Sequence, residues 1–469
     1  MKKKNVGKLV LLFLSMFFVY LIGTNYVQNY ASATGDSVEK DGLIYELDNS
    51  GHAVLSGVTK ERGAARPASV RRFLEKEKPY CFSFIAKEPN VAKWGNPLTI
   101  EKAVVIKGCV YEVNRIGDGA LKECKIGRVV VPNSVRFIGY KAFTGCKFLE
   151  SVVIPESVEV IENLAFEGCE KLRSLEIPNS VKILGDGVFE GCSNLEYAKI
   201  SNSVLKISMR MFASCKRLES VVIPSSVTKI GEFAFRDCSN LKNVIILGKL
   251  TEIEESAFWS CYRLENINLP DSVTKIGKQA FYYCQSLINI EISGLVKIIK
   301  DSTFCNCAKL TNIRIPSSVK EIERAAFWGC SSLEVIQGLS LVEKIGDSAF
   351  GSCLSLKSVK LPNSISNVGK KAFSNCSRLK NVEFEDGFVG SIESKAFFGC
   401  LGLKCVRLPK RSSLAIDVFK NCQGIKSIAF EEGSNLGAIW RDNQWEIFRI
   451  LDSRIDRTTE RVYVNGSLI

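Results

Sequence analysis

The sequence predicts an α/β repeat solenoid of about 14 coils, each 23 residues long. Phenylalanine recurs with this period, and a cysteine follows each of these phenylalanines three positions later. The phenylalanines are Phe143, Phe166, Phe189, Phe212, Phe235, Phe258, Phe281, Phe304, Phe327, Phe350, Phe373, Phe397 and Phe419. The last two intervals are 24 and 22, so the period is restored within one repeat. A fixed period of this size is typical of coils that stack on one shared core.

One coil, residues 218–238, shows how each repeat is built. Segment 220–223 places apolar residues at every second position, the pattern of a short strand with one buried face. Pro224 ends the strand because proline has no N–H for a neighbouring strand, and segment 227–230 predicts a second extended piece. Within 234–238, Ala, Phe and Cys lie three or four apart, which predicts a single helical or 3₁₀ turn with one apolar side.

Proline occupies its position in alternate coils through the middle of the chain, at 178, 224, 270, 316 and 362, but not at 201, 247, 293, 339 and 385. We infer a 46-residue unit in which alternate coils leave the strand by different turns. The alternative is duplication history without structural consequence.

The cysteines are predicted to be buried and free rather than crosslinked. Fourteen of the eighteen belong to the ladder from Cys124 to Cys422 and share an apolar phase with Phe and Leu. Side chains of successive coils point the same way, which is poor disulfide geometry. Cys81 and Cys109 are the one pair considered as a bridge. Cys405 is expected to point outward and to be the most reactive thiol.

Residues 1–33 are predicted to be a secretory signal peptide. Lysines at 2, 3, 4 and 8 precede an apolar run, 9–22, and Ala-Ser-Ala at 31–33 fits a cleavage site. The alternative is an uncleaved anchor. No later apolar run would span a membrane, so the mature chain is expected to be extracellular.

Charge favours acidic partners. The formal charge is +13, and between Ser355 and Phe430 thirteen Lys or Arg face five Asp or Glu. An exported basic region suggests acidic glycans, anionic wall polymers or acidic protein surfaces, and export argues against nucleic acid. The alternative is a solvated face that keeps the protein soluble.

Enzymatic activity is not expected. The single histidine, His52, precedes the repeats, so a histidine-based general base or metal site within the solenoid is excluded. Phosphate-loop, nucleophile-elbow and zinc-protease motifs are absent from the sequence, and no cysteine spacing fits a zinc site. We therefore expect no cofactor and no metal.

The repeat L-x-x-V-x-I-P-x-S-V-x-x-I-G-x-x-A-F-x-x-C resembles the BspA-like leucine-rich repeats of surface proteins, over residues 98–432. The resemblance implies a right-handed, curved solenoid with short parallel strands on its concave face. It also implies a secreted or cell-surface location and a role in adhesion or host-protein binding. Residues 34–97 are then an N-terminal cap with an insertion, and 433–469 a C-terminal cap.

Binding residues are predicted from their outward phase. One group is an asparagine column that could hydrogen-bond a glycan or peptide: Asn243, Asn266, Asn289 and Asn312. The other is basic and lies toward the C-terminus: Lys357, Lys360, Lys380, Lys404, Arg407 and Lys426. The asparagines could equally serve only to solvate the sheet. Two functions remain open: a binding protein that uses the sheet for a protein or glycan ligand, and a structural envelope or matrix protein that self-associates.

Overall fold

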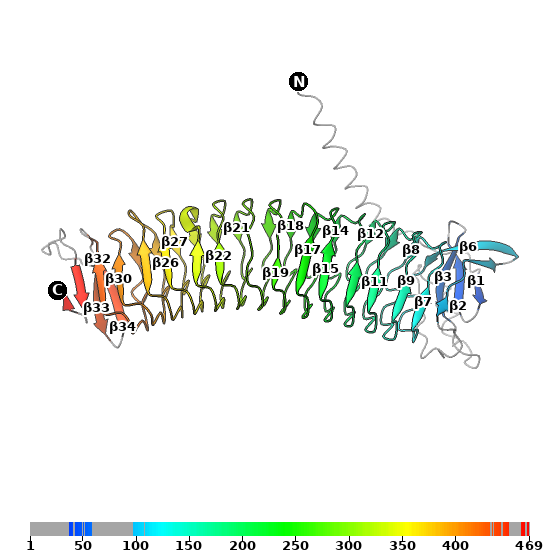
Figure 1. The fold of residues 1–469 in the computed structure, drawn as a ribbon, viewed down its shortest axis with the longest axis horizontal. Coiled ribbons are helices and arrows are strands. Elements are labelled where there is room, and N and C mark those ends of the chain that lie inside the picture. Colours follow the sequence, from blue (N-terminus) through cyan, green and yellow to red (C-terminus); the bar gives the residue numbers. More distant parts are fainter. Residues whose placement is uncertain are drawn as a thin grey trace, which may run out of the picture.

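The computed structural model is a long, gently bowed stack of coils, with the N- and C-terminal strands at opposite ends (Figure 1). It describes residues 37–40, 43–48, 50, 52–58, 97–106, 108–431, 434, 436–441, 444–449, 461–464 and 467–468. The predicted signal peptide, the insertion at 59–96 and Cys81 lie outside the described residues. Among those residues, no helix has the length and apolar character needed to cross a bilayer.

Each coil contributes its first strand to one row of parallel strands, here called the first row. Neighbouring strands lie 23 residues apart, as where Ser220 pairs with Asn243 and Ile223 with Ile246. The row consists of β4 (Leu98–Thr99), β7 (Arg128–Val130), β9 (Ser151–Val153), β11 (Ser174–Glu176), β13 (Tyr197–Lys199), β15 (Ser220–Ile223), β17 (Asn243–Ile246), β19 (Asn266–Ile267), β22 (Asn312–Arg314), β24 (Val335–Gln337), β26 (Ser358–Leu361), β28 (Asn381–Phe384), β30 (Cys405–Leu408) and β32 (Ser427–Phe430).

The second strand of each coil forms a second parallel row. These strands are mostly two residues long, with one residue facing the core. They are β6 (Cys109–Ile116), β8 (Phe137–Ile138), β10 (Val160–Ile161), β12 (Ile183–Leu184), β14 (Lys206–Ile207), β16 (Lys229–Ile230), β18 (Glu252–Ile253), β20 (Lys275–Ile276), β21 (Ile298–Ile299), β23 (Glu321–Ile322), β25 (Lys344–Ile345), β27 (Asn367–Val368), β29 (Ser391–Ile392) and β31 (Ser413–Leu414).

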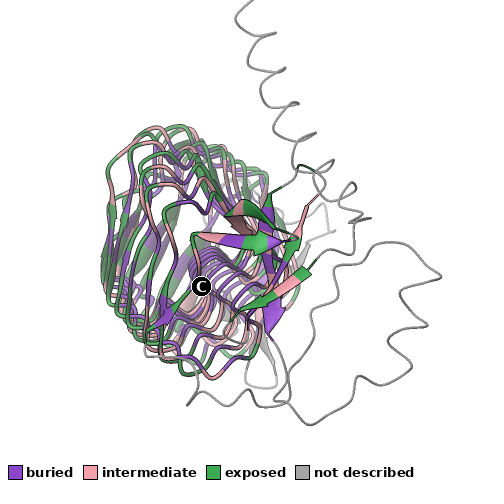
Figure 2. Ribbon diagram, turned by 90° about the vertical axis from the view of Figure 1, so that its right-hand side faces the viewer, coloured by how far each residue is buried: buried purple, intermediate pink, exposed green. Residues whose placement is uncertain are grey.

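The third side of each coil, here called the turn side, carries the Phe-x-x-Cys repeat. The phenylalanine rings point inward and stack from coil to coil, with centroids 4.9 Å apart between Phe143 and Phe166 and 5.6 Å apart between Phe397 and Phe419. An end-on view shows the buried residues inside the superposed coils (Figure 2). The sequence prediction of a continuous phenylalanine column is confirmed. Because each ring buries its faces against neighbouring rings, the stack and not the coil is the unit that forms a core.

The cysteine prediction is confirmed for the described residues. Every ladder thiol from Cys124 to Cys422 is free and buried. Most of these thiols also donate a weak hydrogen bond to the previous coil: the Sγ of Cys238, for example, lies 3.0 Å from the carbonyl oxygen of Phe212. Cysteine therefore serves both as a small apolar group and as a weak donor to the neighbouring main chain.

The predicted helical turn, and with it the α/β class, is wrong. The described residues contain no α-helix, and their single 3₁₀ segment is η2 (Leu339–Leu341). In the coil of Phe235, both Phe233 and Asp237 have positive φ, 56° and 58°. The N–H groups of these three residues donate to the next coil, and those between them donate three residues back. A left-handed residue at every fourth position breaks a helix, so consecutive tight turns bring the apolar residues to one side.

Proline alternation does not by itself change how the first row ends. In proline coils the turn closes with an N–H donated three residues back, as from Val227 to Pro224. The same bond forms where proline is missing, from Val296 to Ser293 and from Val342 to Leu339. In these coils the alternation therefore changes the residue at the turn and leaves its hydrogen bond in place.

Extra strands continue the stack at both ends. At the N-terminal end, β1 (Ser37–Lys40), β2 (Leu43–Leu47) and β3 (Ala53–Val58) form antiparallel pairs, and β3 runs parallel to β6, which also pairs with β5 (Ala103–Ile106). At the C-terminal end lie β33 (Leu436–Arg441), β34 (Gln444–Arg449), β35 (Arg461–Val464) and β36 (Ser467–Leu468). Trp445 is buried there, and its Nε1 donates to the carbonyl of Ile425 at 3.3 Å.

Removing one ring from the phenylalanine column should destabilise the protein strongly. We expect Phe258→Ala to lower the free energy of unfolding by about 3–5 kcal/mol, because it leaves a cavity between two rings. Phe258→Leu should cost roughly 1–2 kcal/mol, since the first coil already carries Leu121 at this position. Urea unfolding measures both. The exposed control Tyr197→Ala should change the value by less than about 0.5 kcal/mol, and a similar loss in all three would contradict the role of the column.

The buried thiols should make the fold sensitive to alkali. Burial raises the pKa of Cys192 to about 12, and that of Cys215 lies well above its ordinary value for the same reason. An unfolded thiol ionises near pH 8.5, so above this pH the unfolded chain has lost protons that the native thiols keep. The free energy of unfolding should therefore fall as pH rises from about 8.5, by at most about 1.4 kcal/mol per pH unit for each thiol.

Urea midpoints between about pH 7 and pH 10 would measure this loss. The double variant Cys192→Ala, Cys215→Ala should show a shallower decline over the same range. An unchanged slope would mean that other groups cause the alkaline loss.

Candidate binding surfaces

The first row presents the predicted asparagine column on its outer side. Asn243 pairs with Asn266, and Asn266 with Asn289, and these residues and Asn312 are all exposed. The Nδ2 of Asn312 donates to the hydroxyl of Thr311 at 3.3 Å. Across the described coils, the four amides form no hydrogen bond with one another. The column therefore offers amide groups to water or to a ligand and is not a self-bonded ladder.

The predicted basic column also lies on this face, one residue before the strands. Lys357, Lys380, Lys404 and Lys426 are exposed, and main-chain bonds align them: the N–H of Lys380 donates to Lys357 at 2.9 Å and that of Lys426 to Lys404 at 2.8 Å. Lys357, however, pairs with the carboxylate of Glu334. Lys380, Lys404 and Lys426 form no ion pair with any described residue. The uncompensated charge thus begins at Lys380.

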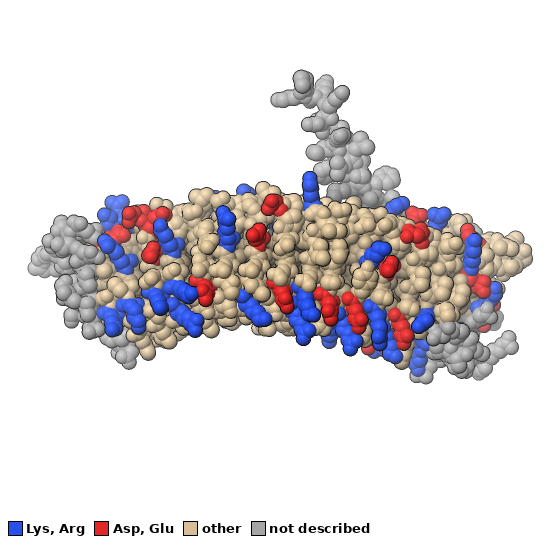
Figure 3. All heavy atoms as spheres, in the orientation of Figure 1, with Lys and Arg blue, Asp and Glu red and all other residues tan. Residues whose placement is uncertain are grey.

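Elsewhere on the molecule, charges of opposite sign face each other across neighbouring coils. Lysine and acidic side chains 23 residues apart pair in this way along the N-terminal and middle coils. Examples are Lys147 with Glu170 at 3.0 Å, Glu176 with Lys199 at 3.5 Å, Glu219 with Lys242 at 3.5 Å, Lys320 with Glu343 at 2.9 Å and Glu321 with Lys344 at 2.9 Å. Basic side chains gather without acidic neighbours along the lower margin near the C-terminal end (Figure 3). The repeat therefore neutralises its own charge except in the last coils.

The remaining predicted residues lie two positions further along the strands. Lys360 and Arg407 are exposed in β26 and β30, and Lys360 lies opposite Glu383 of β28. An acidic residue thus interrupts this second column, whereas Lys380, Lys404 and Lys426 follow one another directly. Cys405 adjoins Lys404 and is exposed, which confirms its predicted outward position.

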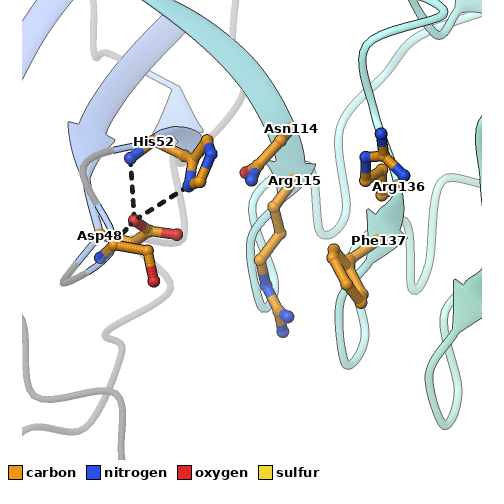
Figure 4. Close-up of a pocket in the computed structure, with 7 residues that line it drawn as sticks. Asp48, His52, Asn114, Arg115, Arg136 and Phe137 are labelled. Atoms are coloured by element: carbon orange, nitrogen blue, oxygen red, sulfur yellow. Dashed lines mark hydrogen bonds and ion pairs between the residues drawn. The ribbon is translucent and has the colours of Figure 1, made fainter.

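A polar pocket of about 270 Å³ lies where the N-terminal strands meet the first coils. Its walls come from the loop between β2 and β3, from β6 and from the start of β8 (Figure 4). The lining residues are Asp48, Ser50, His52, Asn114, Arg115, Arg136 and Phe137.

The cationic groups of this pocket already have acidic partners. Arg115 binds Glu162 at 3.0 Å and Asp118 at 3.1 Å, and Arg136 binds Glu159 at 2.9 Å. Burial alone would lower the pKa of Arg115, but the two carboxylates outweigh it and raise that pKa.

The pocket also holds the three residue types of a hydrolytic triad, but not its geometry. His52 Nδ1 and the carboxylate of Asp48 are 3.9 Å apart, too far for a hydrogen bond. Ser50 gives its backbone N–H to the same carboxylate at 2.9 Å. The Asp48 carboxylate thus organises the loop rather than a reacting group.

A cluster of aromatic residues on the turn side was missed from the sequence. This aromatic strip consists of Phe233, Trp259, Tyr282, Tyr283 and Trp328. Trp259 and Tyr282 lie 4.9 Å apart, and Tyr282 and Tyr283 lie 4.7 Å apart, measured between ring centroids. The signal was available, because other coils carry mainly small, polar or charged residues at these positions, such as Gly145, Gly168 and Thr144.

Stacked coils with two rows of parallel strands define a leucine-rich-repeat type of solenoid. The family model for the BspA type leucine rich repeat region matches residues 114–230, 205–334 and 335–439. These matches cover most of the chain, so the protein belongs to the BspA-type leucine-rich-repeat family. No curated protein matches the sequence.

Solved structures of bacterial proteins share the fold. A leucine-rich repeat protein from Bacteroides ovatus is 28% identical, with a TM-score of 0.59 over 80% of this chain and 95% of that one. A leucine rich cell surface protein from Faecalibacterium prausnitzii is 23% identical (TM-score 0.47; 86% and 96% covered). The pneumococcal vaccine antigen PcpA is 20% identical (TM-score 0.49; 84% and 93% covered).

Cys405 should react in the folded protein, whereas the ladder thiols should not. Exposed thiols meet the reagent directly, while buried neutral thiols react only after unfolding. Brief alkylation followed by peptide mapping should place the label on Cys405 and Cys109. Labelling of Cys238 or Cys261 at the same rate in native buffer would contradict the buried ladder.

Proposed function

We propose that this protein is a secreted or cell-surface binding protein that holds a protein or glycan ligand on its first row. The single observation behind the proposal is the uncompensated lysine column on a rigid face whose other charges are paired. BspA-type repeats belong to cell-surface proteins, and the leader at 1–33 has the composition of an export signal. A stack of coils gives an extended, preorganised surface, which lowers the entropic cost of binding a long ligand.

The geometry of the proposed surface has two further parts. We take the coils to be right-handed, because connections between parallel strands in one sheet are right-handed in about 98% of cases. We also place the first row on the concave side of the bow, so that a ligand could contact several coils at once. Residues 34–97 and 433–469 serve as caps in this proposal, with 98–432 as the binding solenoid.

The proposed ligand is acidic where it meets the C-terminal coils. Lys380, Lys404 and Lys426 would contact it first, with Lys357, Lys360 and Arg407 beside them. The asparagine column from Asn243 to Asn312 would supply uncharged hydrogen bonds further along the face. Binding of this kind needs neither a cofactor nor a metal, and we propose no enzymatic activity and no nucleic-acid partner.

Charge reversal tests the proposal. The variant Lys380→Glu, Lys404→Glu, Lys426→Glu should bind immobilised dextran sulfate or polyglutamate at least about tenfold more weakly than the wild type, because three attractive contacts become repulsive. The matched control Lys370→Glu, Lys371→Glu, Lys395→Glu has the same net charge in the same coils but changes the turn side. It should keep most of the affinity.

Equal losses in both variants would show that net charge alone, and not the column, causes binding. Sedimentation at several concentrations addresses the second function. A stable monomer would count against self-association into an envelope or matrix, whereas concentration-dependent growth of the wild type would favour it.

A further inference from the structure

The aromatic strip departs from the pattern that the repeat sets for its own turn side. The residue after each column phenylalanine is Thr144, Glu167, Glu190 and Ala213 in the early coils. It then becomes Arg236, Trp259, Tyr282, Cys305 and Trp328 in five consecutive coils, before returning to Gly351 and Ser374. Because these coils share the backbone of the others, the fold itself does not require the aromatic rings.

Two members of the strip occupy strained backbone positions. Phe233 has φ of 56° and Tyr283 has φ of 61°, in the left-handed region that favours glycine and asparagine. The positions equivalent to Tyr283 hold Gly329, Asn306 and Asn375. A bulky side chain is costly there, and such strain is typical of functional sites. The aromatic residues are thus present in spite of the local backbone preference.

The strip forms a continuous, partly exposed surface along the stack. The guanidinium of Arg236 lies 5.4 Å from the ring centroid of Trp259 and 5.6 Å from that of Phe233. Trp259 continues to Tyr282 and Tyr283. Trp328 is 39% exposed, and its ring lies close over Gly351, where an added Cβ would come within 2.8 Å of it. Gly351 therefore leaves room for the indole to lie against the coil.

The cations around the strip are already neutralised. Arg236 pairs with Asp237 at 3.2 Å, Arg324 with Asp301 at 3.1 Å and Arg210 with Glu190 at 3.8 Å. An anionic ligand would have to compete with these carboxylates. The strip therefore differs in charge from the lysine column on the first row, and it favours an uncharged ligand.

We propose that the aromatic strip binds an uncharged polysaccharide. A sugar ring has a face of C–H groups that can pack on Trp328 or Tyr283, and a rim of hydroxyls that can bond to tyrosine hydroxyls and to the amide of Asn306. Trp and Tyr suit such a ligand because each combines an apolar ring with a polar group. A protein hot spot usually needs a desolvated pocket, whereas this surface places polar groups between its rings.

Affinity electrophoresis of the full chain in gels that contain laminarin, xylan, mannan or soluble cellulose derivatives would test the proposal. The variant Tyr283→Asn, Trp328→Ser uses residues that the repeat itself carries at these positions, Asn306 and Ser374, so its fold should be retained. We expect at least one polysaccharide to retard the wild type and the variant to bind about tenfold more weakly. Circular dichroism and the urea midpoint would verify folding.

The control Tyr197→Ser, Tyr262→Ser removes two exposed tyrosines outside the strip and should bind as the wild type does. Binding should also survive added salt and the Lys380, Lys404 and Lys426 reversal, which separates this site from the lysine column. Retardation by none of the polysaccharides would overturn the proposal. So would equal binding by the strip variant, or binding that salt abolishes. Loss of a protein ligand alone in the strip variant would assign the strip to a protein instead.

Discussion

The structure depends on the requirement that each coil satisfies its buried groups in the next coil. The phenylalanine rings stack on one another, and alternate N–H groups of the turn side donate to carbonyls 22 residues further on. No coil can bury its own apolar side, so the period must be kept throughout the stack. The long coil before Phe397 shows how strict this is, because the rings on either side remain stacked at 5.4 and 5.6 Å. The extra residue is accommodated in the turn near Gly387, where φ is 81°.

The same requirement explains why the outer surfaces can vary so widely. Positions that face the core hold Phe, Cys, Leu, Val or Ile, and any change there is felt by two neighbours. Outward positions affect little beyond their own coil. Charge pairs, an asparagine column, a lysine column and the aromatic strip can therefore all be placed on one scaffold. Surfaces on different sides of the coil can then serve ligands of different chemistry.

The sequence supported much of the fold and part of the site. The period, the inward phase of Phe and Cys, and the free state of the described thiols followed from spacing alone. The helical turn did not, because residues three or four apart lie on one side of a helix and also on one side of two tight turns with left-handed residues between them. Only the φ angles at residues such as Phe233 and Asp237 distinguish the two. Spacing also placed Lys357 with Lys380, but not the ion pair that removes Lys357 from the free column.

By itself, then, the sequence determined which residues face the core, the length of each coil and the family of the protein, because these depend on periodicity. The tertiary structure decided which outward residues remain available, because pairing and exposure depend on contacts between coils. It is the neighbouring coil that neutralises Lys242 with Glu219 and leaves Lys404 uncompensated. It is also the neighbouring coil that brings Trp259 against Tyr282 to form a surface.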